Sequence, residues 1–360
     1  MNLVRAPART GWGFFVGQVA AHETGRCRAG QGKSARALRG GGPQALPRAQ
    51  GAGWRFFGQL LYSQRQGPYL CPVHSSPPSY LTPEALTAFI RTALAEDVGD
   101  GDHSALAAIP ADARNRAHLL VKGEGILAGM ALAPLIFRAV DPALQLTALL
   151  ADGTPVKHGD VAFTVEGPAR SILTAERLVL NCMQRMSGIA TYTAHLNTLL
   201  AGTRAKLLDT RKTTPNFRIC EKWAVLIGGG VNHRYGLFDM IILKDNHVDY
   251  AGGVAQAIAA THAYLAQTGR QLPIEIETRT LDEVQQVLDA GGIQRIMLDN
   301  MNPTQLRAAV ALVNGRFPTE ASGGITEQTI AEVARTGVDY ISVGALTHSV
   351  KSLDLSLKAY

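Results

Sequence analysis

The sequence predicts an α/β protein with two folded parts, an N-terminal α/β sandwich domain and a C-terminal open α/β barrel with six strands. Two patterns support this fold class. Short strand-like runs separated by glycine turns occupy residues 118–172, which is typical of a small sheet domain. After Gly202, apolar strand patterns alternate with helical ones, and such βα repeats form a parallel sheet with right-handed crossovers.

Length and charge fit this organisation. The chain has 360 residues, of which 46% are hydrophobic and 18% charged, which is ordinary for a globular protein of one or two domains. The net charge of +6 divides into +9 for residues 1–83 and −3 for the remaining 277 residues. The folded part is therefore mildly acidic, and the charge gives no indication of nucleic-acid binding. No apolar run of the sequence is long enough to span a membrane.

Residues 1–78 are predicted to be a disordered leader and linker. They are rich in Arg, Gly, Ala and Ser and poor in acids, which is the composition of an organelle transit peptide. The apolar stretch 12–21 follows two arginines, so a secretory signal is one alternative, and an artefactual upstream extension is another. The four cysteines lack the spacing of a zinc site or a disulfide framework.

Residues 79–190 are assigned to the sandwich domain. Thr82 followed by Pro83 has the pattern of a helix start. The predicted strands are 118–121, 144–150 and 161–166, with a short helix at 131–140 and a long one from about residue 173 to 200. A strand from the C-terminal end of the chain could also return to this domain.

Residues 191–360 are assigned to the barrel. The predicted strands are 205–208, 239–243, 274–276, 295–298, 320–321 and 340–343, and the predicted helices are 254–266, 281–290, 303–313 and 327–336. Six strands are too few for a closed eight-stranded barrel, so we expect an open one.

In βα barrels, functional residues collect at the C-terminal ends of the strands. Basic residues follow the first two strands here, single acids follow the next two, and glycine turns follow the last two. The residues in this order are Thr210, Arg211, Lys212, Lys244, Glu277, Asp299, Ser322, Gly323, Gly324 and Gly344. This ordering predicts a site for an anionic, metal-bound substrate.

The glycine turns after the last two strands are predicted to bind phosphate. Each precedes a predicted helix, and backbone N–H groups at a helix start bind anions when no Cβ obstructs them. Their position also matches the usual phosphate site of barrel enzymes. Ser322 can add a hydroxyl donor.

Glu277 and Asp299 are the predicted metal ligands. As a pair on adjacent strands they could hold Mg²⁺ against pyrophosphate oxygens or stabilise a ribosyl cation, and the alternative is a solvated strand end or a helix cap. Glu275 points to the same face as Glu277, so periodicity alone does not choose between them.

The basic residues exceed what one phosphate requires. Arg211, Lys212, Arg234 and Lys244 would be explained by two further carboxylates on the substrate, because Arg binds a carboxylate bidentately. The alternative for each is a surface ion pair. His233 and His348 could donate to a substrate or be buried structural histidines, and the sequence leaves both open.

Several motifs occur in an order that resembles one family. They are ERLVLN (176–181), QRMSGIAT (184–191), DTRKTTP (209–215), GGGVNHR (228–234), LKDNH (243–247) and GALTHS (344–349). Together they resemble the quinolinate phosphoribosyltransferases, also called decarboxylating nicotinate-nucleotide pyrophosphorylases. The stretches 222–227 and 277–281 are most similar to plant and algal members.

The resemblance implies a pentosyltransferase of NAD biosynthesis. Such an enzyme transfers phosphoribosyl from phosphoribosyl pyrophosphate (PRPP) to quinolinate with decarboxylation, and releases nicotinate mononucleotide, CO₂ and pyrophosphate. It implies Mg²⁺ and a homodimer or higher homo-oligomer with shared active sites, in which Arg177 reaches the partner's site. It also implies a plastid location, with the mitochondrion as the alternative.

The same resemblance implies roles for the site residues. Arg211, Lys212, His233, Arg234 and Lys244 would hold quinolinate or pyrophosphate, with Thr210 as a further substrate contact. Lys212, Glu277 and Asp299 would be catalytic, and the motif spacing selects Glu277 over Glu275 beside the ribose and Mg²⁺. The 5′-phosphate would be held by Ser322, Gly323, Gly324 and Gly344, with His348 beside them.

Two departures from the family pattern stand out. Asn216-Phe217 replaces the usual Gly-Leu, and one extra residue lies near 293–294. Three alternatives to the predicted activity stay open: a non-catalytic paralogue, another phosphate-binding barrel enzyme in which Lys244 forms a Schiff base, and a nicotinate phosphoribosyltransferase.

Overall fold

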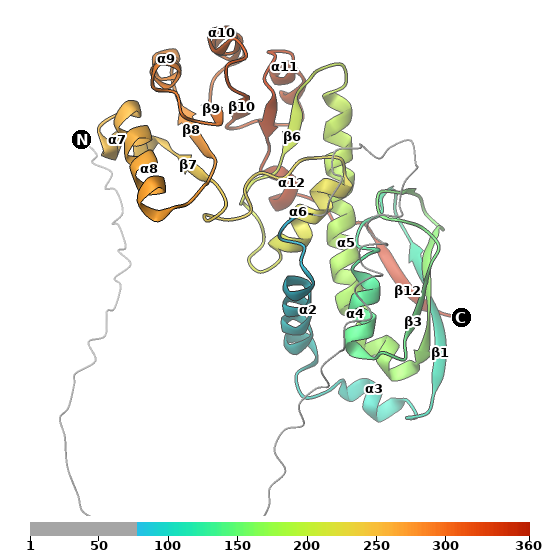
Figure 1. Ribbon diagram of the computed structural model, residues 1–360. Coiled ribbons are helices and arrows are strands. Elements are labelled where there is room, and N and C mark those ends of the chain that lie inside the picture. The colour runs from blue at the N-terminus through green and yellow to red at the C-terminus, as the bar shows by residue number, and fades with distance from the viewer. Residues whose placement is uncertain (1–77) are drawn as a thin grey trace, which may run out of the picture. The chain divides into compact units, whose positions relative to one another are not determined.

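The structure is a computed structural model that describes residues 78–360 (Figure 1). The predictions for the leader therefore fall outside the described residues, apart from residue 78 itself. The predicted fold class is confirmed, with a small N-terminal sheet domain followed by a six-stranded parallel sheet. Within residues 78–360, none of the helices combines the length and apolar character needed to cross a membrane.

The small domain contains a four-stranded antiparallel sheet in the order β12-β1-β5-β3. Its strands are β1 (Arg114–Val121), β3 (Gln145–Ala148), β5 (Val161–Pro168) and β12 (Leu355–Ala359). The last strand of the chain thus returns to the first sheet, where Leu357 pairs with Leu119. Two short strands, β2 (Gly125–Ile126) and β4 (Pro155–Val156), form a separate ladder.

Helices cover this domain. Helix α2 (Pro83–Val98) begins as predicted, since the Thr82 hydroxyl accepts a hydrogen bond from the Ala85 amide at 3.2 Å. Helices α3 (His103–Ala108) and α4 (Ala133–Val140) follow. Helix α5 (Ala169–Leu199) is 31 residues long, and it continues unbroken past residue 190, where the sequence divides the two predicted domains.

The parallel sheet has the order β6-β11-β10-β9-β8-β7. Its strands are β6 (Lys206–Leu208), β7 (Ile241–Leu243), β8 (Ile274–Thr278), β9 (Arg295–Asp299), β10 (Thr319–Ser322) and β11 (Tyr340–Ser342). All five pairings are parallel. Strands β6 and β7 are the two edges of this sheet, so the barrel is open between them, as the strand count predicts.

The helices of the second part are α6 (Arg218–Ile227), α7 (Asp245–Ala251), α8 (Val254–Thr268), α9 (Leu281–Ala290), α10 (Pro303–Val313), α11 (Ile330–Ala334) and α12 (Ala345–His348). Helices α9, α10 and α11 lie along one side of the strands in Figure 1. Helix α6 was not predicted, because it buries Glu221 and Lys222 completely and so lacks a clean polar face. Helix α11 is shorter than predicted, because a turn occupies residues 327–329.

Strand periodicity creates two layers of polar residues on one face of this sheet. Glu275 and Glu277 are two residues apart on β8, and Glu320 and Ser322 are two apart on β10, so the side chains within each pair share a face. In each pair the first residue is fully buried and the second lies nearer the C-terminal end of its strand. The strands therefore carry a buried layer beneath the strand-end residues.

Candidate active site

The ends of the first and last strands of the parallel sheet meet at Gly344. A Cβ atom at Gly344 would lie 3.1 Å from Lys212 Cδ and 3.0 Å from His348 Nε2. The Thr347 hydroxyl donates to the Lys212 carbonyl at 2.8 Å, and the Thr210 hydroxyl accepts from the Lys212 amide at 3.0 Å. Pairing of β6 with β11 thus brings together residues 132 or more positions apart in the sequence.

The ends of β7, β8 and β9 form a second group of charges. Lys244 Nζ lies 2.9 Å from Glu277 Oε2, and the Lys244 side chain is half exposed. Burial raises the pKa of Asp299, and the negative charge of Glu277 raises that pKa further. Two mutually repelling carboxylates beside one lysine form a place where an additional cation is favourable.

The turn at Ser322-Gly323-Gly324 requires glycine at its centre. Gly323 has φ 95°, and a Cβ there would lie 2.2 Å from Asn300 Oδ1. The Asn300 amide in turn donates to the Ser322 carbonyl at 2.9 Å. The predicted start of the following helix at residue 327 is three residues early, since α11 begins at Ile330, so this turn does not lead directly into a helix. By contrast, Gly344 is the N-cap of α12.

Two arginines lie near each other at the open edge between β6 and β7. Arg234 is partly buried and donates to the Met240 carbonyl at 3.0 Å. Burial lowers the pKa of Arg234, and the neighbouring positive charge of Arg211 lowers it further. Neither guanidinium forms an ion pair with a carboxylate among residues 78–360. The carboxylates of Glu275 and Asp239 partly offset this effect, since both raise the pKa of Arg234. Two neighbouring guanidiniums without a direct ion pair still favour binding of an anion.

A fully buried ion pair lies beneath these arginines. Lys222 Nζ lies 2.5 Å from Asp209 Oδ1, and both side chains are inaccessible to solvent. Asp209 also accepts from Asn232 Nδ2 at 2.6 Å and from the His233 amide at 2.8 Å, while Lys222 donates to the His233 carbonyl at 3.0 Å. This network fixes the backbone on both sides of His233, directly before Arg234.

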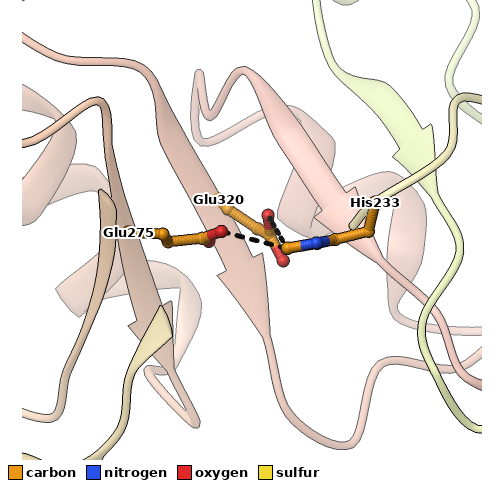
Figure 2. Close-up of side chains that lie close together, drawn as sticks. All are labelled: His233, Glu275 and Glu320. Atoms are coloured by element: carbon orange, nitrogen blue, oxygen red, sulfur yellow. Dashed lines mark ion pairs between the residues drawn. The ribbon is translucent and has the colours of Figure 1, made fainter. Parts of the chain in front are cut away.

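A second buried cluster surrounds the His233 ring (Figure 2). Nε2 lies 3.0 Å from Glu275 Oε2 and 3.4 Å from Glu320 Oε2, although neither contact has the alignment of a hydrogen bond. Arg295 donates to Glu320 Oε2 at 2.8 Å and stacks over the Tyr340 ring. We call Asp209, Lys222, His233, Glu275, Arg295 and Glu320 the buried ionic layer.

Both nitrogens of His233 face protein groups. Nδ1 accepts from the Arg234 amide at 2.7 Å, which requires that Nδ1 carry no proton. Burial lowers the pKa of His233, but the two glutamates outweigh burial and raise that pKa to about 9. The hydrogen bond at Nδ1 indicates a neutral ring, whereas the raised pKa favours a ring with a proton on both nitrogens. We favour the neutral ring with its proton on Nε2, because an N–H cannot donate to a protonated nitrogen.

The side chains of His233, Glu275 and Glu320 lie close enough together to hold a metal ion. Within residues 78–360, this is the one cluster of His, Cys, Asp or Glu side chains with that geometry. Its charges argue against a metal. Arg295 already lies within 3.8 Å of both glutamates, so a divalent ion would leave a surplus positive charge in a buried place. Glu277 and Asp299 offer the oxygen ligands that Mg²⁺ prefers and lie at the strand ends.

The other predicted residues lie on the surface. Arg177 is exposed on α5, and His348 is exposed with Nδ1 2.7 Å from Ser349 Oγ.

Asn216, where the family usually has glycine, has φ 62°. Asn is the non-glycine residue that tolerates this conformation best, so the turn keeps the backbone that glycine would adopt. Phe217 beside it packs on Phe89 of α2, with ring centroids 5.7 Å apart.

Sequence reasoning did not single out Asp209 as a functional residue or find Lys222, Glu320 and Arg295. All four are charged residues within apolar stretches, and that signal, a charge where the pattern demands burial, could have identified them.

Comparisons with known proteins agree with the architecture. Two family models match, the N-terminal domain of quinolinate phosphoribosyl transferase over residues 95–187 and its C-terminal domain over residues 189–358. The chain is 50% identical, over 78% of its length and 84% of the relative's, to a chloroplastic nicotinate-nucleotide pyrophosphorylase (carboxylating) of Arabidopsis thaliana. It is 49% identical, with the same coverage, to a mitochondrial quinolinate phosphoribosyltransferase (decarboxylating) of Nicotiana tabacum.

A solved structure shows the same fold. The crystal structure of NadC from Streptococcus pyogenes has 40% sequence identity and a TM-score of 0.73, and the match covers 79% of this chain and 98% of that one.

Proposed function

Because this chain belongs to the quinolinate phosphoribosyltransferase family, we propose that it transfers phosphoribosyl from PRPP to quinolinate. The proposed products are nicotinate mononucleotide, CO₂ and pyrophosphate, and the proposed role is de novo NAD biosynthesis. The observation that carries the proposal is the positive charge at the strand ends, where Arg211 and Arg234 lie near each other and neither forms an ion pair with a carboxylate among residues 78–360. A dicarboxylate substrate supplies the missing charge.

In the proposed reaction, the ring nitrogen of quinolinate attacks the anomeric carbon of PRPP and pyrophosphate leaves. The carboxylate next to the now cationic nitrogen then leaves as CO₂, and a proton replaces it on the ring carbon. The ring cation accepts the electron pair of the breaking bond, so the protein needs to orient the reactants and exclude water.

Individual residues have proposed tasks in this scheme. Arg211 and Arg234 bind the quinolinate carboxylates, assisted by Thr210. Lys212 binds the pyrophosphate end of PRPP, and the turns at Ser322-Gly323-Gly324 and Gly344, with His348, bind the 5′-phosphate. These tasks agree with the unpaired guanidiniums and with the contact of Lys212, Gly344 and His348.

Glu277 and Asp299 are proposed to hold Mg²⁺ and to face the ribose. Their mutual repulsion and their oxygen donors fit this ion. When bound, Mg²⁺ supplies positive charge to the leaving pyrophosphate. Lys244 Nζ pairs with Glu277 Oε2 at 2.9 Å, and this ion pair competes with the alternative in which Lys244 attacks a carbonyl to form a Schiff base.

The test is release of labelled CO₂ from carboxyl-labelled quinolinate by the purified protein. We expect release that depends on both PRPP and Mg²⁺, and that falls at least about 100-fold in Arg234→Ala, since two charge-assisted hydrogen bonds are lost. Arg270→Ala is the matched control, because Arg270 is exposed on the surface. No release from folded wild-type protein would favour the non-catalytic paralogue, and transfer to nicotinate instead would favour a nicotinate phosphoribosyltransferase.

We further propose a homo-oligomer in which Arg177 completes the partner's site. Its exposed position on α5 supports this. Mixing Arg177→Ala with Arg234→Ala subunits should restore part of the activity that each variant lacks, because one mixed site then holds both arginines. If mixed subunits exchange and stay inactive, the shared site is ruled out.

We propose that residues 1–78 direct the protein to a plastid, with the mitochondrion as the alternative. Both destinations occur in the names of its relatives, and the basic, acid-poor composition fits either. Fusion of residues 1–78 to a fluorescent protein tests this, and a secreted fusion would contradict it.

A further inference from the structure

Arg185 on helix α5 connects three segments of the second part of the chain. Its Nε and Nη2 atoms donate to Glu221 Oε1 at 3.1 and 3.0 Å. Nη2 also donates to the Thr347 carbonyl, and Nη1 donates to the Val350 carbonyl at 3.3 Å. Three-quarters of the Arg185 side chain is buried, and that of Glu221 is completely buried.

Two of these contacts, with Glu221 and with Thr347, lead to residues of the strand-end site. Glu221 accepts from the Thr214 amide at 3.0 Å and from the Thr214 hydroxyl at 2.9 Å, two residues after Lys212. Thr347 directly precedes His348, and its hydroxyl donates to the Lys212 carbonyl at 2.8 Å. A single guanidinium therefore holds both segments that meet at Gly344.

The surface of α5 around Arg185 is shaped to receive the α12–β12 segment. A Cβ at Gly188, one turn further along, would lie 2.2 Å from the Lys351 carbonyl oxygen, so only glycine permits this approach. On the other side of Arg185, Gln184 donates to the Leu355 carbonyl at 2.8 Å and accepts from the Leu353 amide at 3.0 Å. Residues 184–188 of α5 therefore pack closely against the segment between α12 and β12, and Arg185 is the charged residue among those that make the contacts.

Stability alone does not account for the geometry of Arg185. A buried glutamate needs one cation, and a lysine would satisfy that need as a point charge. Arg185 instead directs its remaining donors to two carbonyl groups of the α12 region. The planar fork of an arginine fixes the relative positions of all the groups that it contacts.

We propose that Arg185 is a positioning residue for the phosphate-binding end of the site. It keeps the Lys212 segment and the Gly344–His348 segment aligned, so that the lysine and the Gly344 turn face the same substrate. Arg185 itself does not touch the substrate. This inference rests on the proposed function and deepens it, because it assigns Arg185 to recognition of PRPP and not of quinolinate.

Steady-state kinetics of the full chain with each substrate varied in turn test the inference. In Arg185→Lys we expect the KM for PRPP to rise about tenfold or more, as several charge-assisted hydrogen bonds become one, while the KM for quinolinate stays within about twofold. Arg204→Lys is the matched control, because the exposed Arg204 side chain also pairs with a carboxylate, that of Asp339, and donates to a backbone carbonyl, that of Gly337. Both of its KM values should stay unchanged.

Glu221→Gln is the second variant and keeps the side-chain shape. It should shift the KM for PRPP in the same direction by a smaller factor, and it decides the question if Arg185→Lys does not fold. A parallel rise of both KM values with a lower Tm, or no change in either, would show that Arg185 is merely structural. If wild-type protein releases no CO₂, the proposed function fails and the inference falls with it, whereas an active wild type without the KM split overturns the inference alone.

Discussion

Strands β8 and β10 each carry two polar residues on one face, one in the buried ionic layer and one at the strand end. Charged side chains are paired differently in these two layers. In the buried ionic layer, Asp209 has Lys222, and Glu320 has Arg295, each within 2.8 Å. At the strand ends, Arg211 and Arg234 repel each other, and so do Glu277 and Asp299. Burial explains the difference, because an unpaired charge inside a protein costs several kcal/mol. At the strand ends Glu277 is buried and pairs with the half-exposed Lys244, whereas Arg211, Arg234 and Asp299 are at least partly accessible, and accessible groups can keep their charge available for a substrate.

The largest effect should follow when the buried layer loses one partner. Lys222→Met leaves Asp209 charged without its cation, and we expect the free energy of unfolding to fall by about 3–5 kcal/mol. Urea unfolding measures this. The control is Arg204→Met, which breaks the partly exposed pair with Asp339 and should cost about 1 kcal/mol or less. Equal losses in the two variants would mean that burial does not distinguish the layers.

At the strand ends, backbone geometry should matter more for activity than for stability. Gly323→Ala places a Cβ 2.2 Å from Asn300 Oδ1 in a backbone with positive φ, and we expect the KM for PRPP to rise at least about tenfold, with a stability loss of about 1–3 kcal/mol. Gly324→Ala is the matched control, because Gly324 also has positive φ but a Cβ there would have no neighbouring atom within 4 Å. If the two variants have the same kinetics, the contact with Asn300 does not shape the site.

Asp152 is a partly buried carboxylate with no ion pair to a cation among the described residues. It accepts from the Met130 and Ala131 amides at 2.8 and 3.1 Å, but burial outweighs these bonds and raises its pKa from 3.8 to about 6. The folded state therefore binds more protons between pH 4 and 6, so its stability falls as the pH rises through that range, by at most about 3 kcal/mol.

Asp152→Asn removes this titration. The difference in unfolding free energy between wild type and variant, measured by urea unfolding at pH 4 and at pH 7, should therefore change in favour of the variant at the higher pH. If the difference in unfolding free energy between wild type and variant is the same at both pH values, the pKa of Asp152 is not raised by folding. The lack of a neighbouring cation would then cost no stability at this position.

The smallest effect is expected at Asn216, in the turn after the strand-end residue Lys212. Asn216→Gly keeps the positive φ and should leave activity unchanged and stability within about 0.5 kcal/mol, whereas Asn216→Val should lose about 1–2 kcal/mol. Thermal unfolding and CO₂ release measure both. A loss of activity in Asn216→Gly would show that the Asn side chain, and not the backbone, matters at this departure from the family pattern.

Local patterns select residues at the strand ends more readily than residues of the buried ionic layer. Glycine turns and charges that directly follow apolar strands mark strand ends in any parallel sheet, so Lys212, Glu277 and Ser322 could be selected before the fold was known. The pairing of Glu275 with His233 could not be selected in this way. It joins residues 42 positions apart, and period-2 alternation alone does not separate Glu275 from Glu277.

The sequence by itself determined the six parallel strands, the helix caps and the order of charges along the strand ends, because these depend on neighbours within a few residues. Only the tertiary structure decided that β12 returns to the first sheet, that α5 passes from one domain to the other, and that Arg185 reaches Glu221 and Thr347. The contacts of Arg185 with Thr347 and Val350, and of β12 with β1, join segments more than 160 residues apart, and Glu221 lies 36 residues from Arg185. No local pattern records packing over such separations.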